Sequence, residues 1–156
     1  MHRIYTLLTS LSIALCLAAC SSAATTPTAQ TIAPGEEAQV RELIEEFGTR
    51  LRDVSLLGPN VEQEMATHYG PLVSPELLAA WQAAPTRAPG RQTSSPWPER
   101  IEIQQVQLRS ATEYAVSAEI IELTSDGQSF SYPVALRVRK IADTWLIDGY
   151  TAQGQP

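Results

Sequence analysis

Four strands are predicted in the stretch from Glu99 to Tyr150, which reads ERIEIQQVQLRSATEYAVSAEIIELTSDGQSFSYPVALRVRKIADTWLIDGY. Apolar and polar residues alternate along most of it, which is typical of strands that bury one face. Asp126-Gly127 is a signal for a tight hairpin, and Ala142-Asp143 marks a second turn before the last strand. The stretch therefore predicts an antiparallel meander in which each strand pairs with the next.

The alternation changes phase inside the first two strands. In the first, Ile101 and Ile103 share one face while Val106 and Leu108 have the opposite phase, which indicates a bulge near Gln104-Gln105. In the second strand, one face is predicted to carry Tyr114, Val116, Ala118 and Ile120. The apolar residues that follow, Ile121 and Leu123, have the opposite phase. Two such shifts in neighbouring strands predict a strongly bent sheet.

The third strand alternates cleanly. Its inward residues are predicted to be Phe130, Tyr132, Val134, Leu136 and Val138. Arg137 and Arg139 should face away from the core, where Glu119 or Glu122 would pair with them. Exposed pairs of this kind contribute little to stability.

Three helices are predicted before the sheet. From Glu36 to Leu57 apolar residues recur at helical spacing, and Gly58-Pro59 would end this helix. Asn60 is the expected cap of a second helix, with Gln63 in the capping-box position. Ser74-Pro75 should start the third, with Ser as the cap and Pro at the first helical position.

A long loop, APTRAPGRQTSSPWP, connects the helices to the sheet over residues 84–98. Loops of this length without regular structure are uncommon in compact domains and are often functional. Trp97 stands between two of its four prolines. Two hypotheses follow: Trp97 plugs one end of the core, or it is a binding-surface aromatic on a stiff loop.

The N-terminus predicts an export signal over residues 1–19. A short, weakly basic start precedes an apolar run from Ile4 to Leu17, which has the length of a signal peptide rather than of a membrane span. The run ends in Leu17-Ala18-Ala19-Cys20, which resembles the lipobox of bacterial lipoproteins. By that resemblance Cys20 becomes the lipid-modified first residue of the mature chain. The alternatives are a secretory signal cut after Ala19 and an uncleaved anchor.

Residues 20–35 are small, polar and interrupted by prolines, so they predict a flexible tether between Cys20 and a folded domain at 36–153. The full chain has a net charge of −6 and no basic cluster, which argues against nucleic acid as a partner and against electrostatic adhesion to anionic lipid. The expected location is the extracytoplasmic side of the cell membrane, held there by the lipid on Cys20.

Three helices followed by four bent antiparallel strands resemble the NTF2-like (cystatin-like α+β, SnoaL-like) superfamily of cone-shaped domains, and the last strand, Trp145 to Tyr150, carries part of that resemblance. The stretches 69–78 and 90–101 also resemble short bacterial lipoproteins, and this second resemblance implies no activity. The superfamily contains isomerases and cyclases with an Asp or His acid/base in a pocket, and also many members that only bind or dimerise. The fold alone therefore does not decide the chemistry.

One acid/base pair is conceivable in this chain. His68 is the single histidine outside the signal segment, and with Asp148 it would serve a small isomerase or hydrolase. The competing interpretation makes His68 a solvent-facing residue near a helix C-terminus and Asp148 a turn or bulge residue before Gly149. The chain lacks the His and Cys ligands of a structural zinc site, and no cofactor is expected.

The favoured hypothesis is a binding or interaction domain without catalysis, which captures an unknown protein or small molecule. Its contact surface would be the loop from Gly90 to Pro98 together with the open end of the cone. The candidate surface residues are Arg91, Trp97, Tyr69, Trp81 and Tyr150. The exposed sheet face would allow a homodimer.

Overall fold

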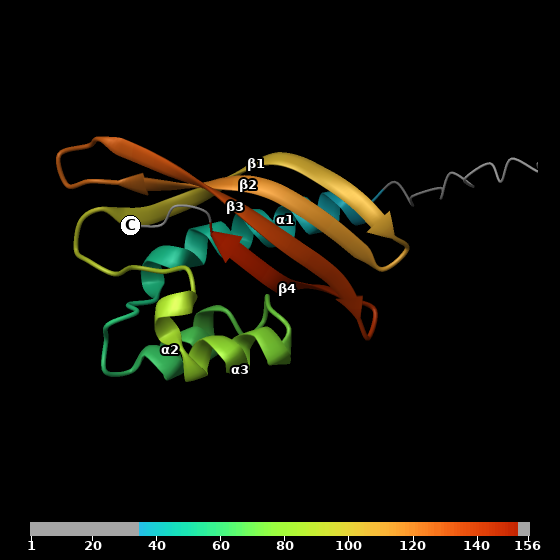
Figure 1. Ribbon diagram of the computed structural model, residues 1–156, viewed down its shortest axis with the longest axis horizontal. Coiled ribbons are helices and arrows are strands. Elements are labelled where there is room, and N and C mark those ends of the chain that lie inside the picture. Colours follow the sequence, from blue (N-terminus) through green and yellow to red (C-terminus); the bar gives the residue numbers. More distant parts are fainter. Residues whose placement is uncertain (1–34, 153–156) are drawn as a thin grey trace, which may run out of the picture.

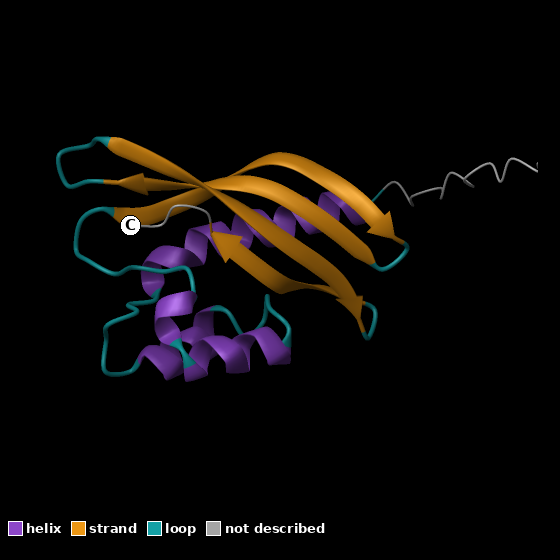
Figure 2. Ribbon diagram, in the orientation of Figure 1, coloured by secondary structure: helices purple, strands orange, loops and turns teal. Residues whose placement is uncertain are grey.

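The computed structural model describes residues 35–152, in which helices cover one side of a single antiparallel sheet (Figures 1 and 2). The elements are α1 (Glu36–Arg50), η1 (Leu51–Asp53), α2 (Val61–His68), α3 (Pro75–Ala83), η2 (Pro85–Arg87), β1 (Trp97–Ser110), β2 (Glu113–Leu123), β3 (Ser129–Ile141) and β4 (Thr144–Ala152). The sheet order is β1-β2-β3-β4. The predicted α+β class, three helices and a four-stranded meander, is confirmed.

Helix α1 lies along the sheet because one stripe of its side chains is apolar. Val40, Ile44 and Phe47 are fully buried against the strands, and Gly48 lets the helix approach β1 closely. A Cβ on Gly48 would stand 2.7 Å from the backbone nitrogen of Ile101, so a larger residue there would push the helix off the sheet. The face of the sheet that α1 covers is called the inner face below, and the opposite one the outer face.

The first helix ends earlier than Gly58-Pro59, where the sequence predicts its end. α1 stops at Arg50, a 3-10 turn follows, and Val54 is already extended. The reason lies in tertiary structure: Ser55 forms a parallel bridge with Arg91 of the long loop, through Arg91 N to Val54 O at 2.8 Å and Leu56 N to Arg91 O at 2.9 Å. Leu51 and Val54 are still buried, so the apolar pattern continued beyond the helix.

The two short helices differ in their caps. Ser74 caps α3 as predicted, because its Oγ accepts a hydrogen bond from Leu77 N at 3.2 Å and Pro75 occupies the first turn. Asn60 occupies the cap position of α2, but no side-chain hydrogen bond caps that helix. The predicted capping box with Gln63 is therefore wrong. Glu64 instead turns back to accept a hydrogen bond from Ser55 N at 2.8 Å.

The bulge predicted near Gln104-Gln105 is confirmed. β1 shifts register between Ile103 and Gln105, and again near each of its ends. The second predicted shift, inside β2, is wrong, since β2 and β3 pair without interruption. Ile121 instead points to the outer face, opposite to Ile120, and is buried there outside the main core. β1 alone carries the irregularity that bends this side of the sheet.

The alternation predicted for β3 is largely confirmed, with Tyr132, Val134, Leu136 and Val138 buried on the inner face. Phe130 is the exception, since 54% of it is exposed near the β2–β3 turn. The prediction that Arg137 and Arg139 pair with Glu119 or Glu122 is wrong. Both guanidiniums bind Asp148 on β4 instead.

The free edge of β4 is covered by the connection between α2 and α3. Ser74 N donates to Ile147 O at 2.8 Å, and Ile147 N donates to Leu72 O at 3.0 Å. This parallel bridge occupies backbone groups that would otherwise be open to another strand. It also places Ser74 beside the β4 bulge at Asp148.

Candidate functional site

An aromatic cluster fills the space between α1, α3 and β4. Phe47 packs edge-on against Tyr69 with ring centroids 5.2 Å apart, and stacks on Trp81 at 6.1 Å. Trp81 in turn contacts Tyr150 edge-on at 5.9 Å. Tyr69 and Trp81 were predicted on a binding surface, and this is corrected: they are 0% and 3% exposed. Their rings pack in the core, where aromatic side chains bury a large apolar area.

Tyr69 also attaches the long loop to this core. Its buried hydroxyl donates to the carbonyl of Pro89 at 2.7 Å, and burial raises the pKa of Tyr69 well above 10.0. Gly90 follows with a positive φ of 155°, and a Cβ there would lie 2.9 Å from the Leu56 side chain. The loop is thus held to the helices at its base, and the exposed residues after it begin at Arg91.

The loop and two neighbouring segments form one end of the domain, on the left in Figure 1. These are the turn after η1, the loop from Gly90 to Pro98, and the turn between β2 and β3. The end carries two large exposed hydrophobic residues, Leu57 at 74% and Phe130 at 54%. Ser95 Oγ accepts from Ser125 N at 3.1 Å, which ties the loop to the hairpin. We call this region the loop end.

Trp97 is the first residue of β1 and is half-buried at the loop end. It pairs with Leu123 and its Nε1 donates to the Glu99 carboxylate at 3.4 Å. It is not among the residues of the hydrophobic core, so the hypothesis of a core plug is not supported. Arg91, also a candidate from sequence, is exposed, although its backbone is bonded to Val54 and Leu56.

Next to the loop end, the inner face carries three acidic groups that sequence analysis did not single out together: Glu122, Tyr132 and Tyr150. Burial raises the pKa of Glu122. Burial and then the Glu122 carboxylate raise the pKa of Tyr132 to about 12. Burial, followed by Tyr132, also raises the pKa of Tyr150. All three shifts favour the protonated forms, so at neutral pH the two phenols act as hydrogen-bond donors and not as bases.

A signal for this group exists in the sequence. Glu122 has the same phase along β2 as Ile120, so alternation places its carboxyl on the inner face. A carboxyl at an inner position is unusual enough to mark the end of a core or a polar site. The Tyr150 hydroxyl is buried and makes no hydrogen bond of normal geometry among the described residues. This is consistent both with the end of a core and with a polar site.

The two residues of the hypothetical acid/base pair have separate partners. Asp148 is the extra residue of the β4 bulge, and its Oδ2 accepts from Arg137 Nε and Nη2 at 3.1 and 2.9 Å and from Arg139 Nη1 at 3.2 Å. Burial by itself would raise the pKa of Asp148, but hydrogen bonds from Arg139, Ser74 and Arg137 outweigh it and lower the pKa. Asp148 therefore stays a carboxylate bound to two arginines.

His68 lies at the end of α2, and its Nδ1 is 3.9 Å from Asp53 Oδ2. Its backbone carbonyl accepts from Arg50 Nη1 at 3.1 Å. Within residues 35–152 no ion pair joins His68 to Asp148. The arrangement thus matches the competing interpretation for both residues, a partly exposed histidine at a helix end and an aspartate in a bulge.

Two further observations concern the described part of the chain alone. No group of three or more His, Cys, Asp or Glu side chains there is placed to hold a metal ion. No helix between residues 35 and 152 is long and apolar enough to cross a membrane. The predicted signal at 1–19, residues 20–34 of the predicted tether and the lipidation site Cys20 lie outside the described residues.

Solved structures share this fold, whereas no protein-family model and no curated protein matches the sequence. An Ntf2-like protein involved in plasmid conjugation has a TM-score of 0.51 at 12% identity, over 77% of this chain and 50% of that one. This chain thus spans half the length of that protein. An NTF-2-like protein of unknown function from Shewanella oneidensis MR-1 gives 0.46 at 15% identity, over 74% of this chain and 97% of that one. The intermembrane space region of chloroplast protein ARC6 gives 0.45 at 12%, over 80% and 99%.

Proposed function

We propose that this NTF2-like domain is a lipid-anchored, extracytoplasmic binding module without catalytic activity, and that the loop end is its contact surface. The fold itself commonly forms ligand-binding domains. The finer assignment rests on the lipobox-like sequence before Cys20, on the apolar residues at the loop end, and on the separate partners of His68 and Asp148.

One observation carries the choice of surface. The chain enters the domain at the start of α1, which lies at the opposite end of the long axis from the loop end (Figure 1). A tether from Cys20 would join the domain at this end, so the loop end is the part of the domain farthest from the point of attachment and stays accessible to a partner. Leu57 and Phe130 are the two large hydrophobic residues that the described chain exposes, and both lie on turns at this end, where they would provide apolar contacts to a partner.

Glu122, Tyr132 and Tyr150 lie next to exposed Phe130 on the inner face. Tyr132 is only 8% exposed and the Tyr150 hydroxyl is buried, so Phe130 is the group that this part of the loop end presents to a partner, such as an apolar peptide segment. Burial raises the pKa of both phenols, so at neutral pH neither phenol acts as a base.

The anchor can be tested with the two cysteines of the chain. The full chain is produced in a bacterium with radiolabelled palmitate, as wild type, as Cys20→Ser and as Cys16→Ser. Wild type and Cys16→Ser should carry label and sediment with membranes, while Cys20→Ser should lose the label. Label on Cys20→Ser, or none on wild type, contradicts the anchor.

The contact surface needs its own experiment. A photo-crosslinking residue at Phe130 should give a discrete crosslinked species in intact cells, whereas the same residue at Glu45, on the exposed face of α1, should give none. Equal crosslinking at both positions, or crosslinking at Glu45 alone, would move the contact surface away from the loop end.

A further inference from the structure

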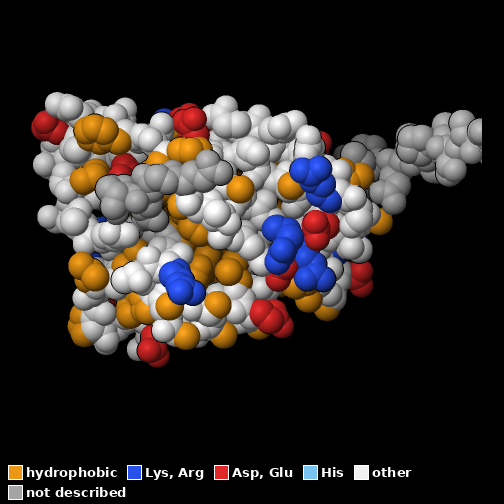
Figure 3. All heavy atoms as spheres, in the orientation of Figure 1, with side chains coloured by type: hydrophobic (Ala, Val, Ile, Leu, Met, Phe, Trp, Pro, Cys, Tyr) orange, Lys and Arg blue, Asp and Glu red, His pale blue; other side chains and the backbone are white. Residues whose placement is uncertain are grey.

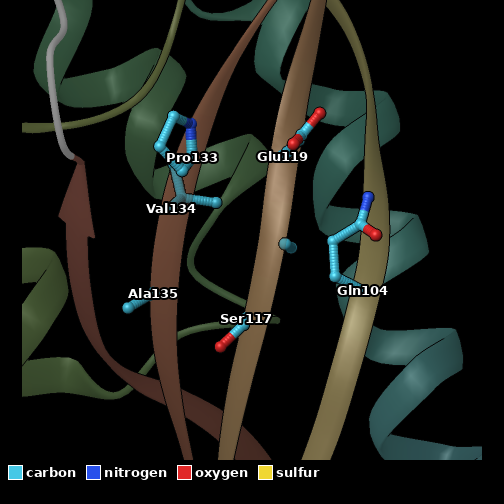
Figure 4. Close-up of a pocket in the computed structure, with 7 residues that line it drawn as sticks. Gln104, Ser117, Glu119, Pro133, Val134 and Ala135 are labelled. Carbon is cyan, nitrogen blue, oxygen red and sulfur yellow. The ribbon is translucent and has the colours of Figure 1, made fainter.

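The outer face of the sheet has a shallow hollow at its centre, where none of the described helices covers it (Figure 1). The hollow has a volume of about 210 Å³, and three neighbouring strands line it (Figure 4). The lining residues are Gln104 on β1, Ser117, Ala118 and Glu119 on β2, and Pro133, Val134 and Ala135 on β3. In the space-filling view of this side, charged groups gather over one part of the face and leave much of it uncharged (Figure 3).

Short side chains create the hollow. Ser117 and Ala135 pair directly across β2 and β3, and both are exposed. Ala118 and Val134 form the floor, because their own side chains are buried in the core on the inner face. Gln104, the extra residue of the β1 bulge, adds a carboxamide at the side. An extended backbone can therefore lie close to the strands here and find hydrogen-bonding groups beside it.

Charges of opposite sign stand at the two ends of the hollow. Glu119 lines one end, where its partner across β2 and β3 is Pro133. Arg137 is four residues farther along β3 on the same face, which corresponds to about 13 Å in a strand. The hollow is thus bipolar along the strand direction.

Asp148 holds two arginines at the basic end. Its Oδ2 accepts from Arg137 Nε and Nη2 at 3.1 and 2.9 Å, and from Arg139 Nη1 at 3.2 Å. An arginine has five N–H donors, so each guanidinium keeps donors beyond those bound to Asp148. The two side chains are 53% and 50% exposed. This fixed pair is suited to a carboxylate, which accepts hydrogen bonds from planar guanidinium groups.

Glu119 supplies the acidic end. Its partner across β1 and β2 is Glu102, and the carboxylate of Glu102 is bound to Arg100. Among residues 35–152 no ion pair holds Glu119 itself. Glu119 is therefore left to attract a cationic group from outside the domain.

We propose that the hollow binds a short peptide with free ends, about three residues long. Its carboxylate lies on Arg137 and Arg139, its ammonium on Glu119, and its backbone over the short side chains between them. Three extended residues span about 10 Å, and the glutamate and arginine side chains cover the rest of the distance. Charge complementarity at both ends selects this ligand. The proposal does not depend on the lipid anchor or on the loop end.

The same features disfavour other small ligands. A phosphate or a nucleotide would gain from the arginines but would be repelled by Glu119 at the other end. The seven lining residues include no aromatic ring, on which a nucleobase would stack. The small volume favours small side chains such as alanine.

A titration with trialanine tests the proposal. The full chain is made with Cys20→Ser, so that it carries no lipid, and is labelled with nitrogen-15 for NMR. Trialanine should shift the amide signals of Ser117 and Ala135 in a saturable way and leave that of Thr93, in the loop, unchanged. N-acetyl-trialanine and trialanine amide each lack one end charge and should bind about fivefold more weakly, as for an exposed ion pair. Equal affinities for the three peptides, or no saturable shift at the hollow, overturn the proposal.

Charge variants assign the two ends of the peptide. Arg137→Gln should weaken trialanine binding about fivefold and should no longer distinguish trialanine from its amide. Glu119→Gln should weaken it by a similar factor and should no longer distinguish trialanine from the acetylated peptide. Arg91→Gln removes an exposed arginine in the loop and should change neither affinity. If each variant loses discrimination at the other end of the peptide, or if Arg91→Gln acts like Arg137→Gln, the proposal is overturned.

A neutral variant and a measurement of mass complete the test. Ser117→Leu fills the hollow without changing the charge, so it should abolish the shifts, and an unaltered thermal midpoint will show that it folds. Unchanged trialanine binding by Ser117→Leu contradicts the site. Sedimentation velocity with and without trialanine examines the competing occupant, a second copy of the chain. A dimer whose hollow signals do not respond to trialanine overturns the proposal.

Discussion

The inner and outer faces of the sheet belong to the same strands but differ in packing: helices cover the inner face, and none of the described helices covers the outer face. Adjacent residues on β2 make the contrast plain: Ile120 is 0% exposed in the main core, whereas Ile121 is 7% exposed on the other face and outside that core. The inner face is filled by large aliphatic and aromatic side chains between strands and helices. The outer face carries short side chains and charges around a hollow. Stability is thus concentrated on one face, and the other is left available for contacts.

The largest expected effect compares the two isoleucines. Ile120→Ala should lower the free energy of unfolding by about 4 kcal/mol, because it opens a cavity among residues fixed from both sides. Ile121→Ala should cost about 2 kcal/mol, since its surroundings can relax or admit water. Urea unfolding monitored by tryptophan fluorescence measures both. Equal losses would show that the outer side of β2 is packed as tightly as the inner side.

A smaller effect is expected from the carboxylate that organises the outer face. Asp148→Asn should lower the free energy of unfolding by about 2 kcal/mol at pH 7, because charge-assisted hydrogen bonds to Arg137 and Arg139 are lost. The folded-state pKa of Asp148 lies below its ordinary 3.8, so its contribution is complete above about pH 4 and is lost as the pH falls further.

The measurement for Asp148 is urea unfolding at pH 7 and at pH 3. The difference between wild type and Asp148→Asn should narrow at the lower pH. Asp143→Asn is the matched control: Asp143 is exposed in a turn at a φ of 65°, which Asn adopts readily, so this change should be near neutral. A difference that stays constant with pH would mean that Asp148 acts through its shape and not through its charge.

The smallest effect concerns the carboxyl on the inner face. Burial raises the pKa of Glu122, which is the opposite shift from Asp148. Its contribution to stability is therefore present below the ordinary value of 4.5 and is lost as the pH rises through the folded pKa. Glu122→Gln should unfold at a slightly higher temperature than wild type at pH 7, with little difference at pH 4. Calorimetry at pH 7 and pH 4 measures the difference in unfolding temperature between Glu122→Gln and wild type. Glu119→Gln, on the outer face, is the control variant.

Much of the fold was readable from local patterns. The alternation along β3 predicted the buried set around Leu136, and Ser74-Pro75 predicted the start of α3. Helix boundaries failed where distant segments intervened. The bridge between Ser55 and Arg91 ended the first helical region early, although the apolar stripe continued to Val54. Local propensity is weaker than the backbone hydrogen bonds that such a bridge supplies.

The candidate site was harder to predict because its members meet through tertiary structure. The sequence suggests an acid/base pair of Asp148 and His68, yet the β4 bulge turns Asp148 toward Arg137 and Arg139. Tyr69 and Trp81 looked like surface aromatics, and the packing of α1 on α3 buried them. Sequence distance does not reveal which of several carboxyls will be nearest to a guanidinium.

The amino-acid sequence by itself determined the order of the elements, the face that β3 buries, and the composition that disfavours nucleic acid. Those properties depend on residues two to four positions apart, which local geometry links directly. Tertiary structure alone decided the partners of Asp148, the exposure of Leu57 and Phe130 at the loop end, and the opposed charges around the hollow. These features join residues that are far apart in the chain, and they exist because strand register and bulges bring those residues to one place.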